Sequence, residues 1–305
     1  MNIDGFHKNL VEKDFSPTTT KGYESDVVQF IAFYEKMTSE KFSLNEVTPT
    51  DIRAYRQYLI AEKQYKASTV NRRLAALSTY MSWGKQTKLI ETDPTENIRG
   101  IQQVPSGPQY LDRKEQFSLQ RAIEKDLQIS RLRYPKRWIS RQRDNSLVIF
   151  LLHTGLRLNE VLALRVNDLE TSERKGKVIV RQGKGGKQRI VPLNIDARKA
   201  INDWLAVRPQ STSGYLWIAV ENNQNGSLSG RSVQRVIRRI GQDAGIMHLT
   251  PHILRHTFGK NLVDSGVGLE KVAALLGHSD LNTTRIYVAP NQQDLEKAVD
   301  KIAVD

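Results

Sequence analysis

The chain has 305 residues, and its 46 Lys and Arg against 33 Asp and Glu give a formal net charge of +13. Such an excess of positive charge favours a polyanionic partner, with nucleic acid ahead of an anionic membrane. The absence of cysteine excludes disulfides and thiolate zinc sites. No apolar run approaches the ~20 residues of a membrane span, and the first ten residues lack the apolar core of a signal peptide. We therefore expect a cytoplasmic, nucleoid-associated protein that makes no membrane contact.

The N-terminal part of the chain carries only helical signals. Ser16 and Pro17 combine an N-cap with a proline at the first helical position, and they open a helix with apolar residues at helical spacing. A second helix begins at Thr48 or Thr50. A third is capped by Ser68 and ends at Gly84. A last short segment near Asn97 completes the prediction of an all-α, four-helix domain over residues 1–98.

Two arginines of this domain, Arg72 and Arg73, lie near the start of the third predicted helix. They could reach DNA phosphates, or they could simply be a solvated helix face.

The stretch from residue 99 to 110 holds Pro105, Gly107 and Pro108 without periodicity, which indicates an interdomain linker.

A second domain is predicted over residues 111–305, and it opens on a capping pattern of Asp112 and Glu115. A basic segment follows from Arg131 to Arg143, and it is either solvated surface or a contact to DNA backbone. Residues 177–181 and 187–193 alternate as strands on either side of a glycine-rich turn, which predicts a hairpin. The fold class is therefore mainly α with a small β-sheet.

The C-terminal half of this domain reads mostly as helix. Residues 197–207 are amphipathic, and residues 215–218 add a possible strand. A helix over residues 231–244 buries Val233, Val236, Ile237 and Ile240 and leaves its arginines outside that stripe. These are Arg231, Arg235, Arg238 and Arg239. They form either a solvated helix face or, as we favour, the face of a helix that lies along DNA.

The stretch from residue 250 to 287 carries the chemistry. Thr250 and Pro251 start a helix that places His252 and Arg255 on one face. A second apolar helix stops at Gly277, so that His278 sits on a rigid corner. A third short helix, capped by Ser279 or Asp280, carries Tyr287. Two imidazoles, a guanidinium and a phenol at successive helix ends favour a phosphate site over a packed core.

These motifs resemble those of the tyrosine recombinase, or phage integrase, family of the XerC/XerD type. The resemblance rests on His252-x-x-Arg255, Leu276-Gly277-His278 and Tyr287 nine residues later, in register with Thr154-Gly155-Leu156-Arg157. Gly183-Lys184-Gly185-Gly186-Lys187 resembles the family's hairpin lysine. The resemblance covers nearly the whole chain, and it identifies residues 1–98 with the core-binding domain and residues 111–305 with the catalytic domain.

The resemblance implies a role for each residue of the set. Arg157 and Arg255 would neutralise the scissile phosphate with planar guanidinium groups, and Glu160 would orient Arg157. Tyr287 would be the nucleophile and form a 3′-phosphotyrosine. The general acid would be Lys184, with Lys187 as its competitor. His252 would bind the phosphate and accept the tyrosine proton, whereas His278 would donate to a non-bridging oxygen.

Neither a cofactor nor a metal is expected. His248, His252 and His256 have the four-residue spacing of metal ligands, but Pro251 should start a new helix between the first and second of them. Phosphotyrosine chemistry conserves bond energy, so ligation needs no ATP. After Tyr287 an amphipathic segment either packs on its own domain or docks on a neighbouring protomer.

We therefore predict a site-specific recombinase that acts on double-stranded DNA with a specific core site. It would work as a homotetramer, or as a heterotetramer with a paralogue, through a Holliday junction. One alternative is a type IB topoisomerase, which uses the same residue types and would relax supercoiled DNA as a monomer. Another is a non-catalytic DNA-binding protein, which would form no covalent adduct with DNA.

Overall fold

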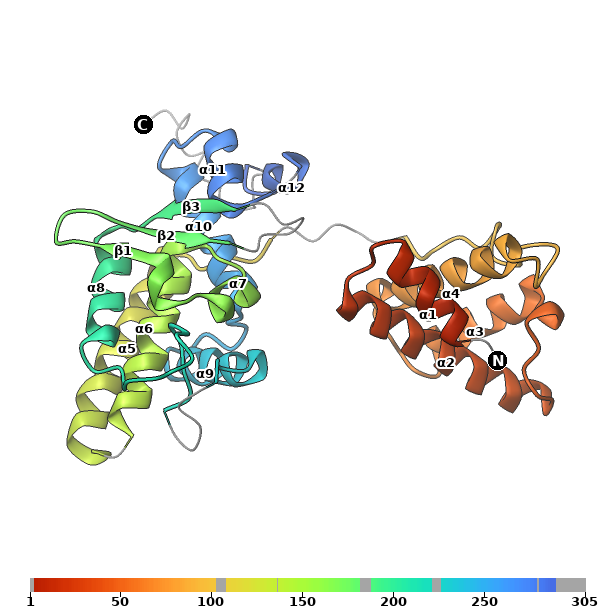
Figure 1. Ribbon diagram of the computed structural model, residues 1–305, viewed down its shortest axis with the longest axis horizontal. Coiled ribbons are helices and arrows are strands. Elements are labelled where there is room, and N and C mark those ends of the chain that lie inside the picture. Colours follow the sequence, from red (N-terminus) through yellow and green to blue (C-terminus); the bar gives the residue numbers. More distant parts are fainter. Residues whose placement is uncertain are drawn as a thin grey trace, which may run out of the picture. The chain divides into compact units, whose positions relative to one another are not determined.

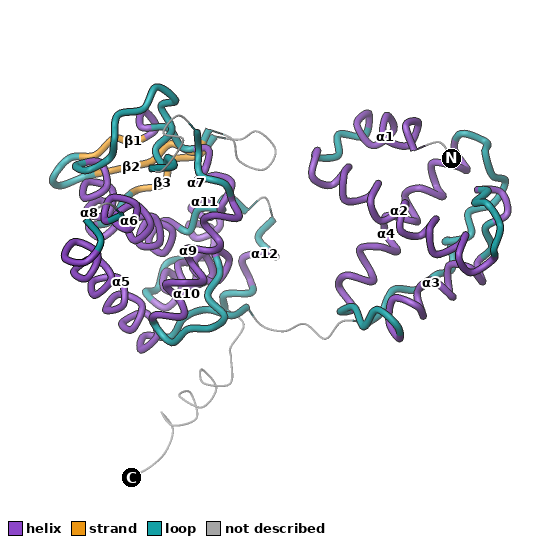
Figure 2. The backbone as a smooth tube through the Cα atoms, turned by 90° about the horizontal axis from the view of Figure 1, so that it is seen from below, coloured by secondary structure: helices purple, strands orange, loops and turns teal. Residues whose placement is uncertain are grey.

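The computed structural model describes residues 3–102, 108–135, 137–181, 188–220, 226–278 and 280–288. The chain divides into two compact units, residues 1–105 and residues 106–305. Figure 1 labels the elements of both units, and Figure 2 shows that strands occur only in the second unit among the described residues.

The first unit is built from helices α1 (Ile3–Glu12), α2 (Pro17–Thr38), α3 (Pro49–Ala61) and α4 (Ala67–Gln86), with a short 3-10 turn η1 (Leu44–Glu46). Two of the predicted starts are confirmed. The Ser16 hydroxyl caps α2 by accepting from the amide of Thr19, and Thr48 forms a capping box with Asp51 at the start of α3.

Three predictions for the first unit are wrong in detail. Helix α1 was not foreseen, although Phe6 and Leu10 are fully buried on its inner face. Helix α4 begins after Lys66 rather than at a Ser68 cap, and it runs through Gly84 to Gln86. Gly84 does not end the helix; it leaves room for Leu44, which would lie 2.9 Å from an added Cβ atom. The segment near Asn97 is a turn.

Aromatic side chains form much of the core of the first unit. Phe30 is fully buried and meets the rings of Tyr34, Phe42 and Tyr55 at centroid separations of 6.3, 6.2 and 5.2 Å. These rings come from α2, α3 and the loop between them, so one cluster holds several elements together. The buried residues of α2 recur at helical intervals because one face of the helix packs against this core.

The second unit begins with α5 (Arg113–Arg133) and α6 (Trp138–Thr154), which the Asp112–Glu115 capping box and the break at Tyr134 and Pro135 delimit. The short helix α7 (Leu158–Ala163) and a 3-10 turn η2 (Val166–Asp168) lead into the sheet. Helix α8 (Ile195–Leu205) then packs along α6 (Figure 1).

The sheet has three antiparallel strands in the order β1-β2-β3, namely β1 (Leu169–Thr171), β2 (Gly176–Val180) and β3 (Arg189–Pro192). Val178 pairs with Val191 in the β2–β3 register, and both are fully buried. The predicted hairpin strands are thus confirmed, and β1 adds a strand that was not expected. Residues 215–218 make only isolated bridges and no strand.

The remaining helices are α9 (Gly230–Asp243), α10 (Pro251–Asp264), α11 (Leu269–Leu276) and α12 (Asn282–Arg285). Thr250 caps α10, and Gly277 ends α11 with a positive φ of 67°, as predicted. Leu281 is the N-cap residue of helix α12 and makes no side-chain cap bond, but the Asp280 carboxylate one residue earlier accepts from the amide of Asn282, the first helical residue, at 2.9 Å. Ser279, the alternative cap, lies outside the described residues.

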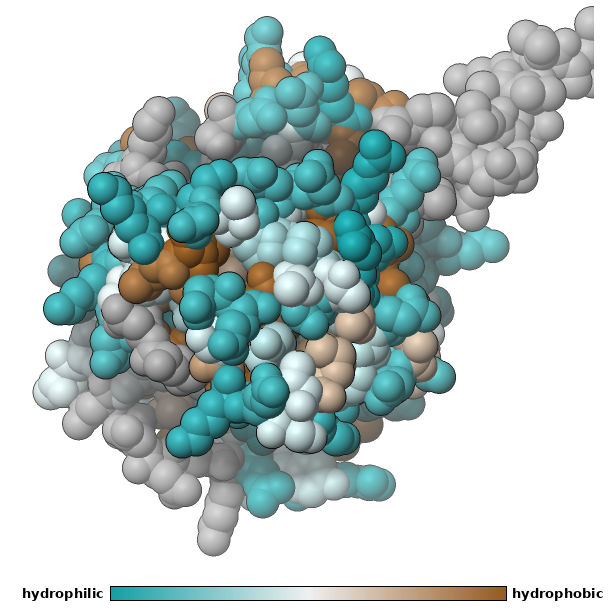
Figure 3. Space-filling model, turned by 90° about the vertical axis from the view of Figure 1, so that its right-hand side faces the viewer, coloured by the Kyte–Doolittle hydropathy of each residue, from teal (hydrophilic) through white to brown (hydrophobic). Residues whose placement is uncertain are grey.

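Hydrophilic residues predominate on the face of the molecule shown in Figure 3, with hydrophobic side chains only in small groups. Across the described ranges, no helix has both the length and the apolar character that a membrane span requires.

The core of the first unit generates a stability prediction. Replacing Phe30 with Ala should lower the free energy of unfolding of this unit by about 3–5 kcal/mol, since it removes a fully buried ring and its aromatic partners. Urea unfolding of the full chain, followed by circular dichroism, measures the change. Val28→Ala on the same helix is the control, because Val28 is 45% exposed and should change stability little. Equal losses in both variants would contradict this account of the core.

Candidate active site

The turn after α6 directs Arg157 toward the centre of the second unit. Helix α6 ends at Gly155, whose φ of 61° is left-handed, and Arg157 is the N-cap of α7. An added Cβ atom on Gly155 would lie 2.3 Å from the Phe258 ring, so only glycine fits this close approach to α10.

The Glu160 carboxylate is the electrostatic centre of the site. It is 6% exposed, and it accepts hydrogen bonds from the Arg157 amide at 2.7 Å and from Arg157 Nη1 at 3.0 Å. Both terminal nitrogens of Arg189 donate to the same carboxylate, at 2.8 and 2.7 Å. Burial alone would raise the pKa of Glu160, but the hydrogen bonds from Arg189 and Arg157 outweigh it and lower the pKa. Glu160 therefore stays ionised and is hydrogen-bonded to Arg157.

Arg189 was missed by the sequence analysis. It lies on β3, and its Nε donates to the carbonyl oxygen of Leu275 at 3.1 Å, so it ties the sheet to the end of α11. An added Cβ atom on Gly277 would lie 2.7 Å from Arg189 Nη1. The sequence offered one signal for a functional role of Arg189, namely a charged residue at the start of a strand whose alternate positions are buried. A surface arginine gives the same pattern, so this signal does not single out a functional residue.

Arg255 is held on α10 by two backbone carbonyls. Its Nη1 donates to Gly155 O at 2.7 Å, its Nη2 donates to Leu276 O at 2.8 Å, and the residue is 5% exposed. Burial, together with the positive charge of Arg157, lowers the pKa of Arg255 to about 10. The guanidinium is still charged at neutral pH, and such a buried charge is favourable only where an anion can approach.

The two predicted arginines converge on one corner. Arg157 Nη2 donates to Gly277 O at 3.0 Å, so the guanidinium groups of Arg157 and Arg255 bond to the successive carbonyls of Gly277 and Leu276. His278 follows directly on this corner. Residues distant in sequence are thus brought to one place by α7, α10 and α11.

Tyr287 lies two residues beyond α12 and is 1% exposed. Its ring packs against Gly259, where an added Cβ atom would lie 2.7 Å from Tyr287 Cζ. The phenol oxygen is 3.0 Å from Nδ1 of His256, so the tyrosine's hydrogen-bond partner is His256 rather than His252. Burial raises the pKa of Tyr287, although Arg255 and Arg157 oppose this. The phenol is therefore protonated at neutral pH and hydrogen-bonded to His256.

His278 stacks on Tyr287 with a centroid separation of 6.4 Å and an interplanar angle of 7°. Its Nδ1 is 2.8 Å from the hydroxyl of Thr284. Burial and the nearby positive charges of Arg255 and Arg157 lower the pKa of His278 to about 4, so the ring is neutral at physiological pH.

His252 is exposed on the first turn of α10, at the edge of a cleft of about 1000 Å³. The residues that line the cleft include Arg157, Glu160 and Arg255, together with Arg238 of α9. Three guanidinium groups face a space wide enough for a phosphate backbone, which makes this cleft the candidate active site.

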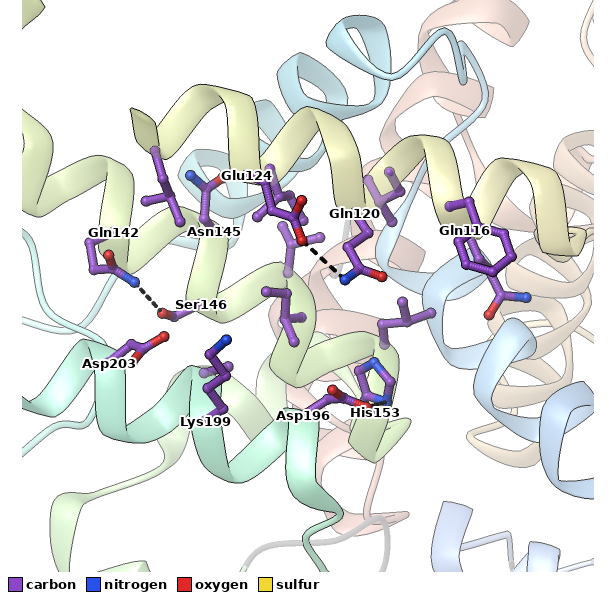
Figure 4. Close-up of a pocket in the computed structure, with 18 of the residues that line it drawn as sticks. Gln116, Gln120, Glu124, Gln142, Asn145, Ser146, His153, Asp196, Lys199 and Asp203 are labelled. Carbon is purple, nitrogen blue, oxygen red and sulfur yellow. Dashed lines mark hydrogen bonds and ion pairs between the residues drawn. The ribbon is translucent and has the colours of Figure 1, made fainter. Parts of the chain in front are cut away.

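A second cavity of about 460 Å³ lies between α5, α6 and α8 (Figure 4). Its labelled polar side chains mix both charges, including Glu124, Asp196, Asp203 and Lys199, and Gln142 bonds to Ser146 at 3.2 Å. Among the described residues, none of those predicted for phosphate chemistry lines it, and its mixed charge does not favour a polyanion.

The predicted DNA-contacting arginines divide into two groups. Arg231, Arg235 and Arg238 are exposed on α9. In contrast, Arg239 Nη1 lies 3.3 Å from Asp126 and 3.5 Å from Asp243. In the first unit, Arg72 forms an ion pair with Asp26 and keeps a side chain that is 48% exposed.

Arg73 is only 8% exposed, bonds to the Tyr55 hydroxyl at 3.3 Å, and lies 4.6 Å from the Tyr65 ring centroid. Two described residues of the basic segment are likewise paired with acids inside the second unit, namely Arg141 with Asp126 and Arg143 with Asp144.

Two predicted features lie outside the described residues. Lys184 and its competitor Lys187 fall within residues 182–187, and the predicted C-terminal amphipathic segment falls within residues 289–305. In the part of the chain that the structure does describe, no three His, Asp or Glu side chains are grouped so that they could hold a metal ion.

Two family models of known proteins match this chain, one in each unit. Residues 130–294 match the model of the phage integrase family, and residues 3–91 match that of the phage integrase N-terminal SAM-like domain. Tyrosine recombinase XerC of Staphylococcus haemolyticus is 31% identical over 94% of this chain and 91% of its own length. Tyrosine recombinase XerC of Roseiflexus castenholzii is 29% identical over 95% of this chain and 89% of its own length.

Solved structures share the fold. The XerA recombinase is 26% identical with a TM-score of 0.53, and the alignment covers 99% of this chain and 98% of that chain. The XerH site-specific recombinase bound to a palindromic difH substrate has a TM-score of 0.74 at 23% identity, over 92% of this chain and 79% of that chain. With the family models spanning both units and the charged corner in place, the chain belongs to the phage integrase family of tyrosine recombinases.

Proposed function

We propose that this protein is a site-specific recombinase that cleaves and rejoins double-stranded DNA through a 3′-phosphotyrosine intermediate. The observation that carries the proposal is the convergence of Arg157 and Arg255 on the adjacent carbonyls of Gly277 and Leu276, beside His278 and Tyr287. Family membership and relatives named tyrosine recombinases support the same activity.

The arginines supply charge neutralisation. Arg157 and Arg189 pair with one carboxylate, Glu160, and Arg255 adds a third positive charge nearby, so the corner keeps an excess of positive charge. A phosphodiester entering the cleft would offset this excess, and the transition state, in which negative charge grows on the non-bridging oxygens, would offset more of it. Arg157 and Arg255 are the groups we assign to those oxygens, and Arg189 holds Glu160 in place.

In the cleavage step the Tyr287 oxygen attacks the phosphorus and the bond from phosphorus to the 5′ oxygen breaks. The phenol proton passes to His252, and Lys184 protonates the leaving 5′ oxygen. In the structure the phenol is buried on His256, so Tyr287 must leave this position before it can reach DNA. We propose that binding of the duplex in the cleft favours that movement.

Contacts to DNA outside the scissile phosphate would come from the exposed arginines. Arg231, Arg235 and Arg238 lie on the solvent side of α9, and Arg238 also lines the cleft. We assign Arg239 and Arg73 to internal ion pairs instead, because each is held by acidic or aromatic partners within its own unit. Arg72 remains a candidate contact of the first unit, which we propose as the core-binding domain.

Strand exchange requires a second duplex and more than one subunit. We propose that the protein acts as a tetramer, with itself or with a paralogue, in which the free 5′ hydroxyl of one duplex attacks the phosphotyrosine of the other. This yields a Holliday junction that a second round of cleavage resolves.

The nucleophile assignment predicts that Tyr287→Phe abolishes covalent protein–DNA adducts and leaves DNA affinity unchanged, because only the attacking oxygen is lost. Nicked duplexes that carry candidate core sites trap the adduct, which denaturing gels detect. Tyr134→Phe is the matched control, since Tyr134 is 50% exposed on the turn after α5. Adducts that persist with Phe at residue 287 would show that another residue is the nucleophile.

The environment of His278 predicts a pH dependence of stability. The unfolded chain protonates this histidine below about pH 6.5, whereas the folded protein does so only near its lowered pKa of about 4. The unfolded state therefore binds more protons between these values, and the free energy of unfolding falls as the pH drops through this window.

His278→Asn should make the free energy of unfolding less sensitive to pH across this window. Urea unfolding of the parent and the variant at pH 7 and pH 5 gives the change in free energy of unfolding for each protein. Comparing the two changes cancels the contributions of titrating groups that both proteins share. An identical pH dependence in the variant and the parent would contradict the neutral state assigned to His278.

A further inference from the structure

We propose that Thr284 is a positioning residue of the active site: its hydroxyl donates to Nδ1 of His278 and keeps the imidazole proton on Nε2, the nitrogen that serves the phosphate. This inference rests on the proposed function, in which His278 donates to a non-bridging oxygen of the scissile phosphate. Neither the sequence motifs nor the comparisons with relatives assign any role to Thr284.

The contact is short, and the hydroxyl that makes it is fully buried. Thr284 lies on α12 and is 0% exposed, and its Oγ1 is 2.8 Å from His278 Nδ1. Within the described residues no other side-chain or backbone group is hydrogen-bonded to this hydroxyl. The hydroxyl and the ring nitrogen are therefore each other's partners.

Two arrangements of protons are compatible with this distance, and they differ in cost. If Nδ1 carried the proton, it would donate to Oγ1, and the hydroxyl proton would be left without an acceptor in a buried place. An unsatisfied buried donor costs about 1–3 kcal/mol. If the hydroxyl donates to an unprotonated Nδ1, both groups are satisfied. The second arrangement puts the ring proton on Nε2.

The tautomer matters because the ring is neutral. Burial, Arg255 and Arg157 lower the pKa of His278 to about 4, so at neutral pH it has only one N–H to offer. Nδ1 faces Thr284, and Nε2 is the nitrogen left for a phosphate oxygen. A ring with its proton on Nδ1 would present a lone pair to that oxygen and repel it.

The same short segment also carries the nucleophile. Thr284 precedes Tyr287 by three residues, and the Tyr287 amide donates to the Thr284 carbonyl at 3.1 Å. The His278 ring stacks on Tyr287 with an interplanar angle of 7°. The segment that supplies the attacking oxygen thus also sets which hydrogen-bond donor faces the phosphate.

The test compares Thr284→Val, which keeps the shape and loses the hydroxyl, with Thr284→Ser, which keeps the hydroxyl. Thr284→Val should slow adduct formation on nicked duplexes on the order of 10–100-fold, as when an outer partner of a functional histidine is removed. DNA affinity should be unchanged, and Thr284→Ser should restore most of the rate. Nitrogen NMR of labelled histidine in the DNA-free protein should show His278 with its proton on Nε2 in the parent and in Thr284→Ser.

A proton on Nδ1 of His278 in the parent protein, or a wild-type cleavage rate for folded Thr284→Val, would overturn the proposal. If Thr284→Val does not fold, the NMR measurement on the parent and the rate of Thr284→Ser still decide the matter. Failure of the proposed function is a separate outcome, because the parent protein would then form no adduct at all, whatever the tautomer of His278.

Discussion

The ion pairs of the Glu160 carboxylate hold the candidate active site together. One buried carboxylate binds Arg157 from α7 and Arg189 from β3, and each arginine then reaches a carbonyl at the end of α11. Removing the carboxylate would leave the positive charges of Arg157 and Arg189 uncompensated in a largely buried place, which is strongly unfavourable. The sheet, the first arginine box and the histidine corner are therefore fixed relative to one another by electrostatics as well as by packing.

An excess of positive charge remains after this pairing, and that excess is what suits the corner to DNA. Arg157 and Arg189 pair with one carboxylate and Arg255 pairs with none, and burial keeps water from screening these charges fully. The cost of burying Arg255 is partly offset by two backbone carbonyls, which satisfy its donors without neutralising it. The arginines are thus already positioned to bind an anion. In contrast, the proposed nucleophile Tyr287 packs against Gly259 and is hydrogen-bonded to His256.

The sequence predicted most of the second unit because its signals are local. Thr250 and Pro251 start α10, Gly277 stops α11, and alternating apolar residues mark strands β2 and β3. Each of these signals comes from residues that are adjacent in the chain. The role of Arg189 was not predictable in this way, because its partners Glu160 and Leu275 are far away in the chain. Likewise, helical periodicity placed Arg73 and Arg239 on helix surfaces. It does not reveal which side chains of other helices contact them, and in the structure Arg73 bonds to Tyr55 and Arg239 pairs with Asp126. Helix α1 was missed because its few apolar residues meet their partners only in the folded unit.

The most direct test of this account is the cleavage rate of Glu160→Gln, which keeps the shape of the side chain and removes its charge. Nicked duplexes and denaturing gels give the rate, and circular dichroism confirms that the variant is folded. The account predicts a loss of cleavage on the order of 100-fold or more with DNA affinity retained, because Arg157 is no longer held at the phosphate. Glu170→Gln, at a side chain that is 58% exposed, should cleave normally. A folded Glu160→Gln protein that cleaves DNA at the parent rate would contradict the claim that this carboxylate organises the active site.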